Sequence, residues 1–599
     1  MAGCGQMTRA RVLLHEFKWR EASWVGAASL GFAAVFAYPM LCRVGYLGPG
    51  TWGWLNLPPE LSHLARFPSN GDWDLFTELR WVPYHTVAHF HEFPFWNPYR
   101  CGGMAMLGNP ESGIITPFFL FYLWFGVYAG LYLEIFFHLA LAFAGGYLLA
   151  RVMDLTRAAA FVCASAFPAS SWLYLHLAVG HLNFLPAVYL PWVIALLIMA
   201  VERESLFVAA IGGLVCALTF TEGNYTFLYT GIMVAILSLA LAVSHRNARP
   251  ALTGLTLGIF AAGFAAMKLI PAWEMLTIHP RPPFGPEYDD LKLMSVYLFS
   301  RNQDLYRVGV SVFLLSEYGA YLSPAFAVLA LIGIFGARLR SLPWLAGAVL
   351  FFLLAQGDGG RHSALSMLRY LPLTQQINLP ARFIIGFSFC TGVLAAQGAD
   401  ALSRLNRRWA TGIAVALLAA GLVDSWMVGP PNLRYMFHNR IEPLPKAAEF
   451  RQWFVANPGN QTEIALANMG SANCEGYGYF AIPTTVSARN NPTDISYHGE
   501  YYLLGSGRAL QTRWTPNELS YDVYASAPTV LVINQNYYPG WMIEEGNASF
   551  VTEGTLLALR LPQGRQQLTL VYWPRFLLVA FALTLGASIA TVILWRKEW

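Results

Sequence analysis

The stretch GIITPFFLFYLWFGV, residues 113–127, decides how the chain passes through a membrane. If this apolar stretch crossed as a helix, Arg151 and Arg157 would fall on the outer side and every later loop would be inverted. If it lies in the interface or re-enters, both arginines fall on the same side as the basic N-terminus, as do the basic residues of the later loops. We therefore interpret 113–127 as an interfacial or re-entrant helix.

The composition is that of a membrane protein. Of the 599 residues, 56% are hydrophobic, 15% aromatic and only 12% charged, which excludes an ordinary soluble domain. The formal net charge is +4, and no basic run is longer than Arg407-Arg408, which argues against nucleic acid as a partner. The chain is expected to be a mainly α, polytopic protein whose surroundings are the lipid bilayer.

Apolar runs long enough to cross about 30 Å of hydrocarbon number about twelve. The first follows the basic residues Arg9, Arg11, Lys18 and Arg20 and lacks a convincing cleavage site, so we interpret it as a retained helix. Basic residues between the runs place both termini in the cytoplasm. The predicted spans are 22–44, 129–150, 158–178, 182–200, 206–222, 224–244, 251–271, 318–337, 342–356, 379–398, 409–428 and 574–595.

This topology predicts three large outward segments, 45–128, 272–317 and 429–573. In the third, TVLVINQ (529–535), LLALRLP (556–562) and QLTLVYW (567–573) have strand composition and are separated by turn signals. We predict a transmembrane helical module over 1–428, a β-rich outer domain of sandwich or jelly-roll type over 429–573, and a last helix with a cytoplasmic tail over 574–599.

Seven cysteines are scattered along the chain without CxxC or Cys/His spacing, so a structural zinc site is not indicated. Cys101 and Cys474 would both face the oxidising side of the membrane. Whether these two form a bridge stays open.

Two carboxylates stand close together in NGDWDLFTELRW, residues 70–81. One interpretation is structural, since Ser69-x-x-Asp72 resembles a capping box, with Asp74 favouring the dipole of the first turn. The other is catalytic, because a carboxylate at the outer mouth of the first span is well placed to remove a proton from a substrate hydroxyl. Both can hold, with one of the two capping while the other works.

The following loop, residues 90–119, is rich in proline, glycine and aromatic residues. Trp96 and Tyr99 are residue types that stack on sugars, and equally types that anchor a chain at the membrane interface. Glu111 precedes the re-entrant stretch, where it is either a neighbour of the helix cap or a second acid reaching back towards Asp72.

Several polar residues interrupt the later apolar runs. Lys268 lies near the end of a span, where it either has a function or extends its amine to the surface. Arg281 could hold a phosphate with its planar fork of donors, or simply be solvated. Glu134 and His138, spaced i and i+4, are expected to pair with each other.

Further candidates lie in the outward turns. His181 follows Gly180, and Glu222 precedes Gly223, at helix ends where local capping competes with substrate contact. Arg361, Arg369 and Arg382 lie in the next outward turn, where any one of them could hold a phosphate, and NLPARF (378–383) could place Arg382 at the membrane surface.

Taken together, these motifs resemble the YfhO-type bacterial membrane proteins of the GT-C glycosyltransferase superfamily. The resemblance rests on GDWD (71–74), FPFWNPYRCGGMAM (93–106), NPESGIITPFFL (109–120), NLPARFIIGFSFCTGVLAAQGAD (378–400), NYYPGW (536–541) and LPQGRQQLTLVYWP (561–574). It covers nearly the whole chain and is weakest over 430–520.

The resemblance implies an enzyme that transfers a sugar from a polyprenyl-phosphate donor to a cell-envelope glycan or lipid acceptor. The reaction takes place on the outer face of the bacterial cytoplasmic membrane. In this group an acidic residue of the first outward loop is the catalytic base, which corresponds to Asp72 or Asp74, with Glu111 as a second acid by position. No cofactor is certain, and use of a divalent metal varies across the group.

Two alternatives remain at this point. A transporter or flippase of lipid-linked glycans would use Lys268, Glu134 and His138 as its intramembrane polar groups. A non-catalytic protein that binds envelope glycans would use Tyr537, Tyr538 and Trp541.

Overall fold

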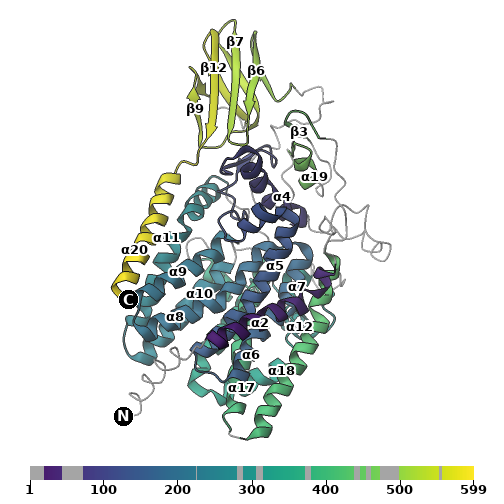
Figure 1. The fold of residues 1–599 in the computed structure, drawn as a ribbon, viewed down its shortest axis with the longest axis vertical. Helices are drawn as coiled ribbons and strands as arrows, with labels where there is room; N and C mark the ends of the chain where they lie inside the picture. Colours follow the sequence, from purple (N-terminus) through teal and green to yellow (C-terminus); the bar gives the residue numbers. More distant parts are fainter. Residues whose placement is uncertain are drawn as a thin grey trace.

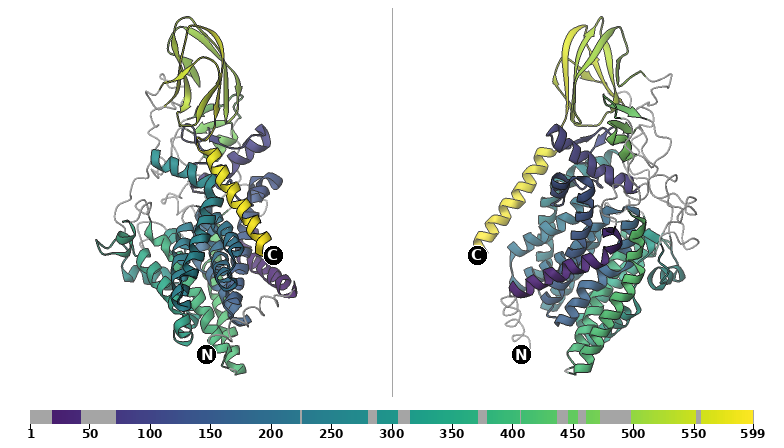
Figure 2. Two further views of the ribbon diagram at one scale, coloured as in Figure 1. Left: turned by 90° about the vertical axis from the view of Figure 1, so that its left-hand side faces the viewer. Right: turned by 45° about the vertical axis from the view of Figure 1, so that its right-hand side comes forward.

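The computed structural model describes residues 19–42, 72–223, 226–279, 288–304, 315–370, 379–405, 407–436, 446–453, 461–471, 498–551 and 556–598. A bundle of helices carries a β-sandwich at one end, and the last helix runs back from the sandwich along the bundle (Figures 1 and 2).

The long helices of the bundle are α2 (Trp19–Phe36), α5 (Phe119–Val152), α6 (Arg157–Ala169), α8 (Leu190–Arg203), α9 (Leu206–Thr221), α10 (Thr226–His245), α11 (Arg249–Ile278), α14 (Pro324–Gly336), α15 (Leu342–Ala355), α17 (Ile384–Ser403), α18 (Arg408–Val428) and α20 (Leu577–Glu598). The shorter α-helices are α3 (Tyr38–Leu41), α4 (Asp72–His85), α7 (Ser171–Val179), α12 (Leu291–Phe299), α13 (Leu315–Tyr318), α16 (Ala364–Leu368) and α19 (Gln461–Leu466). One π-helix is η2 (Thr86–Phe90). The 3₁₀ helices are η3 (Leu182–Tyr189), η4 (Arg338–Arg340), η6 (Pro380–Phe383) and η7 (Pro430–Tyr435).

Within the described residues, 8 helical stretches are long and apolar enough to cross a membrane. Shorter apolar helices accompany them at Glu21–Phe36, Leu206–Thr221, Pro324–Gly336 and Leu342–Ala355. Each predicted span therefore has a helical counterpart, and the chain is a multi-pass membrane protein. The number of helices that cross, and the side on which each loop lies, stay predictions.

Helix α5 contains the fold-back that the sequence led us to expect. It begins at Phe119 and is broken at Gly126, which adopts φ 78° and ψ 168°. The Tyr122 hydroxyl donates a hydrogen bond to Glu134, and the rings of Phe121 and Phe137 lie 5.4 Å apart. A straight helix would separate Tyr122 from Glu134 by about 18 Å. The first turns of α5 therefore double back on the rest, as a re-entrant helix would, beginning later than predicted.

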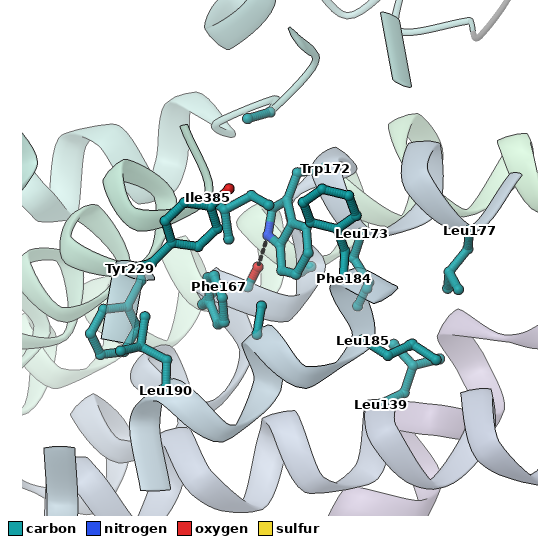
Figure 3. Close-up of a cluster of buried hydrophobic side chains, with 14 of the residues drawn as sticks. Leu139, Phe167, Trp172, Leu173, Leu177, Phe184, Leu185, Leu190, Tyr229 and Ile385 are labelled. Carbon is teal, nitrogen blue, oxygen red and sulfur yellow. Dashed lines mark hydrogen bonds between the residues drawn. The ribbon is translucent and has the colours of Figure 1, made fainter. Parts of the chain in front are cut away.

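A close-packed apolar core holds the bundle together. Phe167, Trp172, Phe184 and Ile385 come from α6, α7, η3 and α17 and meet in one cluster, where the Trp172 indole donates to the Phe167 carbonyl at 3.2 Å (Figure 3). Dense packing of this kind fixes side-chain positions. This packing holds three polar residues in place: His176 on α7, His181 just before η3, and Arg382 just before α17.

Two four-stranded sheets form the sandwich, with strand orders β10-β11-β8-β5 and β6-β7-β12-β9 and antiparallel pairing between the neighbours in each sheet. Alternate side chains, such as Tyr521, Leu531, Leu559 and Leu570, are buried in the core shared by the sheets. The strands are β5 (Tyr501–Leu503), β6 (Gly507–Trp514), β7 (Glu518–Ala525), β8 (Thr529–Asn536), β9 (Trp541–Glu545), β10 (Ser549–Phe550), β11 (Leu556–Leu561) and β12 (Gly564–Tyr572). The three predicted strands correspond to β8, β11 and β12.

Small paired strands lie between the bundle and the sandwich. Strands β1 (Trp96–Asn97) and β2 (Met104–Ala105) are antiparallel, whereas β3 (Arg451–Trp453) and β4 (Met469–Ser471) are parallel. Helix α20 then follows β12 and packs on α11, where the Thr584 hydroxyl donates to the Gly263 carbonyl at 3.1 Å. Helix α20 thus joins the last strand of the sandwich to the helical bundle.

Candidate functional site

The candidate site forms where the start of α4 meets the end of α7. Helix α7 ends at Gly180, whose φ of 98° is a left-handed conformation that glycine tolerates best. A Cβ atom on Gly180 would lie 2.5 Å from the backbone nitrogen of Trp73. The Trp73 indole donates to the Ala178 carbonyl at 3.2 Å. Gly180 therefore lets the two chain segments touch, and this contact brings His181 beside Asp72.

Asp72 and His181 are hydrogen bonded. His181 Nε2 lies 2.6 Å from Asp72 Oδ2, and because a carboxylate only accepts, His181 is the donor. On the other edge of the ring, His181 Nδ1 lies 2.8 Å from His176 Nδ1. Asp72, His181 and His176 thus form a continuous polar chain from the start of α4 into the bundle.

An ion pair closes the cluster on its inner side. The Arg382 guanidinium donates to both oxygens of Glu317, at 2.7 and 2.8 Å, and Glu317 Oε1 lies 3.7 Å from His181 Nε2. Arg382 and His176 also pack against the Phe184 ring, which joins the site to the apolar core. Burial by itself would raise the pKa of Glu317, but Arg382 and then His181 hold that pKa well below its ordinary value. The two hydrogen bonds from Arg382 thus favour the ionised form of Glu317.

All five groups of this cluster, Asp72, His176, His181, Glu317 and Arg382, are buried, and Asp72 is the most accessible, with 9% of its surface exposed. Asp72 is therefore the member of the cluster with the most contact with the surroundings. The arrangement suits a general base at the surface of the cluster, with charged and hydrogen-bonding partners behind it.

Asp74 has a different environment from Asp72. Its side chain is buried and accepts a hydrogen bond from the Thr462 backbone nitrogen at 2.9 Å, while the Thr462 hydroxyl donates to the Asp74 carbonyl at 3.0 Å. Asp74 thus holds the first turn of α19, far along the chain. Ser69, the first residue of the expected capping box, lies outside the described residues.

The loop after α4 is anchored to the sandwich. The Trp96 indole donates to Gln535 at 2.9 Å within the sandwich core. Tyr99 is packed among Trp81, Phe450 and Trp514. Neither ring has any exposed surface, so both have structural roles here and neither is available for a sugar or a lipid headgroup.

The same loop is held on its other side by Glu78. This fully buried carboxylate accepts hydrogen bonds from Asn97 Nδ2 at 2.7 Å and from Arg100 Nη1 at 3.0 Å. Asn517 and Asn536 of the sandwich bond to backbone atoms of the loop. The density of Pro, Gly and Trp in this loop therefore reflects a docking surface for the sandwich.

A second polar cluster lies beneath the fold-back of α5. Lys268 is fully buried and donates to the carbonyls of Ser112 and Thr221, so it does not extend to the membrane surface. Arg80, Glu111 and Glu222 are all close to Lys268. Glu111 therefore belongs to this second cluster. The cluster thus places two basic and two acidic side chains close together in the interior of the bundle.

The expected pairing of Glu134 with His138 is wrong. The Glu134 carboxylate accepts from Arg80 and Tyr122 instead. His138 Nε2 lies 3.1 Å from Glu222, and its Nδ1 faces the Glu134 backbone carbonyl at 2.7 Å. An i,i+4 spacing allows a pair but does not require one when other partners approach from neighbouring helices.

Two of the predictions fall partly or wholly outside the described residues. Arg281 lies there, and its proposed contact with a phosphate stays a prediction. Cys101 is disulfide-bonded, but Cys474, with which a bridge was left open, lies outside the described residues. The oxidised state of Cys101 agrees with an outward-facing loop.

Sequence reasoning missed His176 and Glu317. His176 lies within the predicted span 158–178, and an ionisable residue inside a span is a functional candidate by default. Glu317 is the last residue of the predicted outward segment 272–317, immediately before a span, and Asp72 also lies in a predicted outward segment, 45–128. Both signals were available, but only the folded chain brings these residues together.

No protein-family model matches the chain, and no curated protein matches it. Among solved structures, the cryo-EM structure of the arabinofuranosyltransferase AftD from mycobacteria is similar, with 17% identity and a TM-score of 0.39, over 70% of this chain and 27% of that one. A mutant of AftD gives 17% identity and a TM-score of 0.38, over 70% and 28%. The chain thus spans about a quarter of the length of AftD.

Proposed function

We propose that the chain is a GT-C type glycosyltransferase of the bacterial cytoplasmic membrane, using a polyprenyl-phosphate sugar and a cell-envelope acceptor on the outer face. The observation that carries this proposal is the Asp72 carboxylate, the most accessible member of a buried polar cluster and 2.6 Å from His181. The sequence motifs around Asp72 and Arg382 support the same class. In this proposal residues 1–428 form the catalytic membrane module and 429–573 the outer domain.

The reaction would be a single displacement. Asp72 accepts the proton of the acceptor hydroxyl as its oxygen forms a bond to the anomeric carbon, and the bond from that carbon to the phosphate oxygen breaks. The electron pair leaves with the polyprenyl phosphate, and the anomeric centre is inverted. His181 holds Asp72 through a hydrogen bond to one oxygen, which leaves the other oxygen to take the proton.

The negative charge that develops on the leaving phosphate needs a positive partner. Arg382 and Arg281 are the candidates from the sequence. In this structure Arg382 is paired with Glu317, so its contact with a phosphate would be shared with that carboxylate. Lys268, held by two backbone carbonyls, has a structural role in this proposal.

The test is turnover of a purified, lipid-reconstituted protein supplied with polyprenyl-phosphate sugars and candidate acceptors. Asp72→Asn is expected to lower turnover by at least about a hundredfold, since a general base contributes about 10²–10⁴. Asp74→Asn is the matched control, because its amide oxygen can still accept from Thr462. Full turnover by the Asp72 variant would refute the assignment.

The alternatives receive less support. The transporter hypothesis relies on Lys268, Glu134 and His138, yet all three are hydrogen bonded within the bundle. The glycan-binding hypothesis relies on Tyr537, Tyr538 and Trp541, of which Tyr538 and Trp541 are buried in the sandwich core and Tyr537 is partly buried against it. Movement of lipid-linked sugar without turnover would favour the transporter.

A further inference from the structure

The geometry points to a transition-metal site within the same cluster, and we propose that His176 Nδ1, His181 Nδ1 and Glu317 bind one Zn²⁺ or Mn²⁺ ion. The ligand geometry stands on its own observations, whereas the coupling of the ion to the anionic donor rests on the proposed function. The three residues are all buried, and one ligand atom from each lies within 4.8 Å of the other two.

The two histidines give the first argument. Their Nδ1 atoms face each other at 2.8 Å, where two lone pairs would repel. This distance therefore requires either a proton on one of the two Nδ1 atoms or a metal ion bound by both rings. Two nitrogens on one tetrahedral zinc ion are about 3.3 Å apart, so the rings would separate by only about half an ångström.

The surroundings of the ligands give the second argument. A histidine that binds a metal usually donates its other ring N–H to a carboxylate, which fixes the tautomer. His181 does so here, with Nε2 donating to Asp72 at 2.6 Å and leaving Nδ1 for the ion. A carboxylate ligand is in turn hydrogen bonded, and Arg382 binds Glu317 through both oxygens, each of which keeps a second lone pair. Asp72 and Arg382 thus already make the hydrogen bonds that would orient His181 and Glu317 as metal ligands.

The charge balance gives the third argument. With neutral imidazoles, Asp72, Glu317 and Arg382 leave one net negative charge in a buried cluster. A divalent ion changes this to one net positive charge. A polyprenyl-phosphate sugar carries a single negative charge on its phosphodiester, so donor binding would neutralise the site. The ion and the anionic donor are therefore expected to favour each other's binding.

The donor set also predicts which ions bind. Two imidazoles and one carboxylate suit Zn²⁺ and Mn²⁺, whereas Mg²⁺ prefers oxygen ligands. Three protein ligands leave at least one position for water or substrate, as in catalytic rather than structural zinc sites.

The experiment is calorimetric titration of the full-length protein, purified without a histidine tag and stripped with a chelator, using Zn²⁺, Mn²⁺ and Mg²⁺ in the absence of any donor. We expect one Zn²⁺ per chain, with Mg²⁺ at least about a hundredfold weaker. His176→Gln should weaken Zn²⁺ binding at least about tenfold, and Asp72→Asn should weaken it about 10–100-fold through His181.

His138→Gln is the matched control, since His138 is an equally buried histidine of the same bundle outside the three ligands, and it should bind Zn²⁺ like the unaltered chain. Circular dichroism of each variant shows that it is folded before titration. Absence of one-to-one Zn²⁺ binding, or binding that is unchanged in His176→Gln, overturns the proposal and leaves a shared proton between the two rings. Because no sugar donor is present, this result is independent of whether the glycosyltransferase assignment holds.

Discussion

Asp74 Oδ1 accepts a hydrogen bond at 2.9 Å from the backbone nitrogen of Thr462, a residue 388 positions further along the chain. The Thr462 hydroxyl returns a hydrogen bond to the Asp74 carbonyl at 3.0 Å. The carboxylate thus acts as an N-terminal acceptor for α19 that is supplied by another helix. Two aspartates two positions apart therefore have separate tasks: Asp72 faces the histidines, whereas Asp74 fastens α19 to α4.

Asp74→Ala tests this division of roles. Removing the acceptor leaves a buried N–H without its partner, and we expect a loss of about 1–2 kcal/mol in stability. The measurement is the thermal unfolding midpoint in detergent, compared with Asp74→Asn, which keeps an acceptor oxygen and should lose less. Equal losses in the two variants would mean that the hydrogen bond to Thr462 is not what Asp74 contributes.

Gly180→Ala tests how the site is assembled. Alanine is strained at a φ of 98°, and its Cβ would meet the Trp73 backbone at 2.5 Å, so we expect a loss of at least about 2 kcal/mol. Separating α7 from α4 should also move His181 from Asp72 and reduce transferase turnover. Gly258→Ala is the control, because that helical position has no atom within 4 Å of the new Cβ, and it should be neutral or slightly stabilising. Normal stability of Gly180→Ala would contradict the described contact.

Trp96→Ala distinguishes a structural indole from a sugar-binding one. Trp96 is fully buried and bonded to Gln535, so its removal should leave a cavity in the sandwich and cost about 3–5 kcal/mol. Trp124→Ala, at a side chain that is 66% exposed, should leave the unfolding midpoint within about 2 °C. A sugar platform would behave differently: Trp96→Ala would raise KM for donor or acceptor and leave the midpoint unchanged.

Local sequence signals predicted much of the fold, and the reason is visible in particular elements. Each apolar run became a helix because a membrane helix satisfies its own backbone hydrogen bonds, so length and composition suffice. The fold-back at 113–127 followed from the side on which Arg151 and Arg157 must lie. Strands β8, β11 and β12 were recognisable because their side chains alternate between core and surface.

The site was predicted less completely because its members meet only in three dimensions. Asp72, His181 and Arg382 were each recognised from a local feature, but their partners His176 and Glu317 were not. The burial of Trp96 and Tyr99 was not predicted, because an aromatic residue at a membrane surface and one at a domain junction look alike in sequence. These two locations can be told apart only once the position of the sandwich, which contacts both rings, is known.

His85 gives a prediction about pH. It lies near the end of α4, stacked between Trp81 at 4.6 Å and His89 at 5.0 Å. Burial, followed by the positive charges of His89 and Lys446, lowers the pKa of His85 to about 4. An unfolded histidine has a pKa of about 6.5, so between these values the unfolded chain binds more protons than the folded one. Stability should therefore fall as the pH drops from about 6.5 to 4, and stay unaffected by His85 above that range.

His85→Phe tests this pH dependence, because phenylalanine keeps the stack on Trp81 but carries no ionisable proton. The partial exposure of His85 reduces the expected effect to about 1–2 kcal/mol, so the variant should lose that much less stability than the unaltered chain on acidification from pH 7 to pH 4.5. The measurement is the unfolding midpoint at each pH, with His362→Phe at an exposed loop histidine as the control. If both variants follow the pH profile of the unaltered chain, His85 is not the group whose protonation opposes folding.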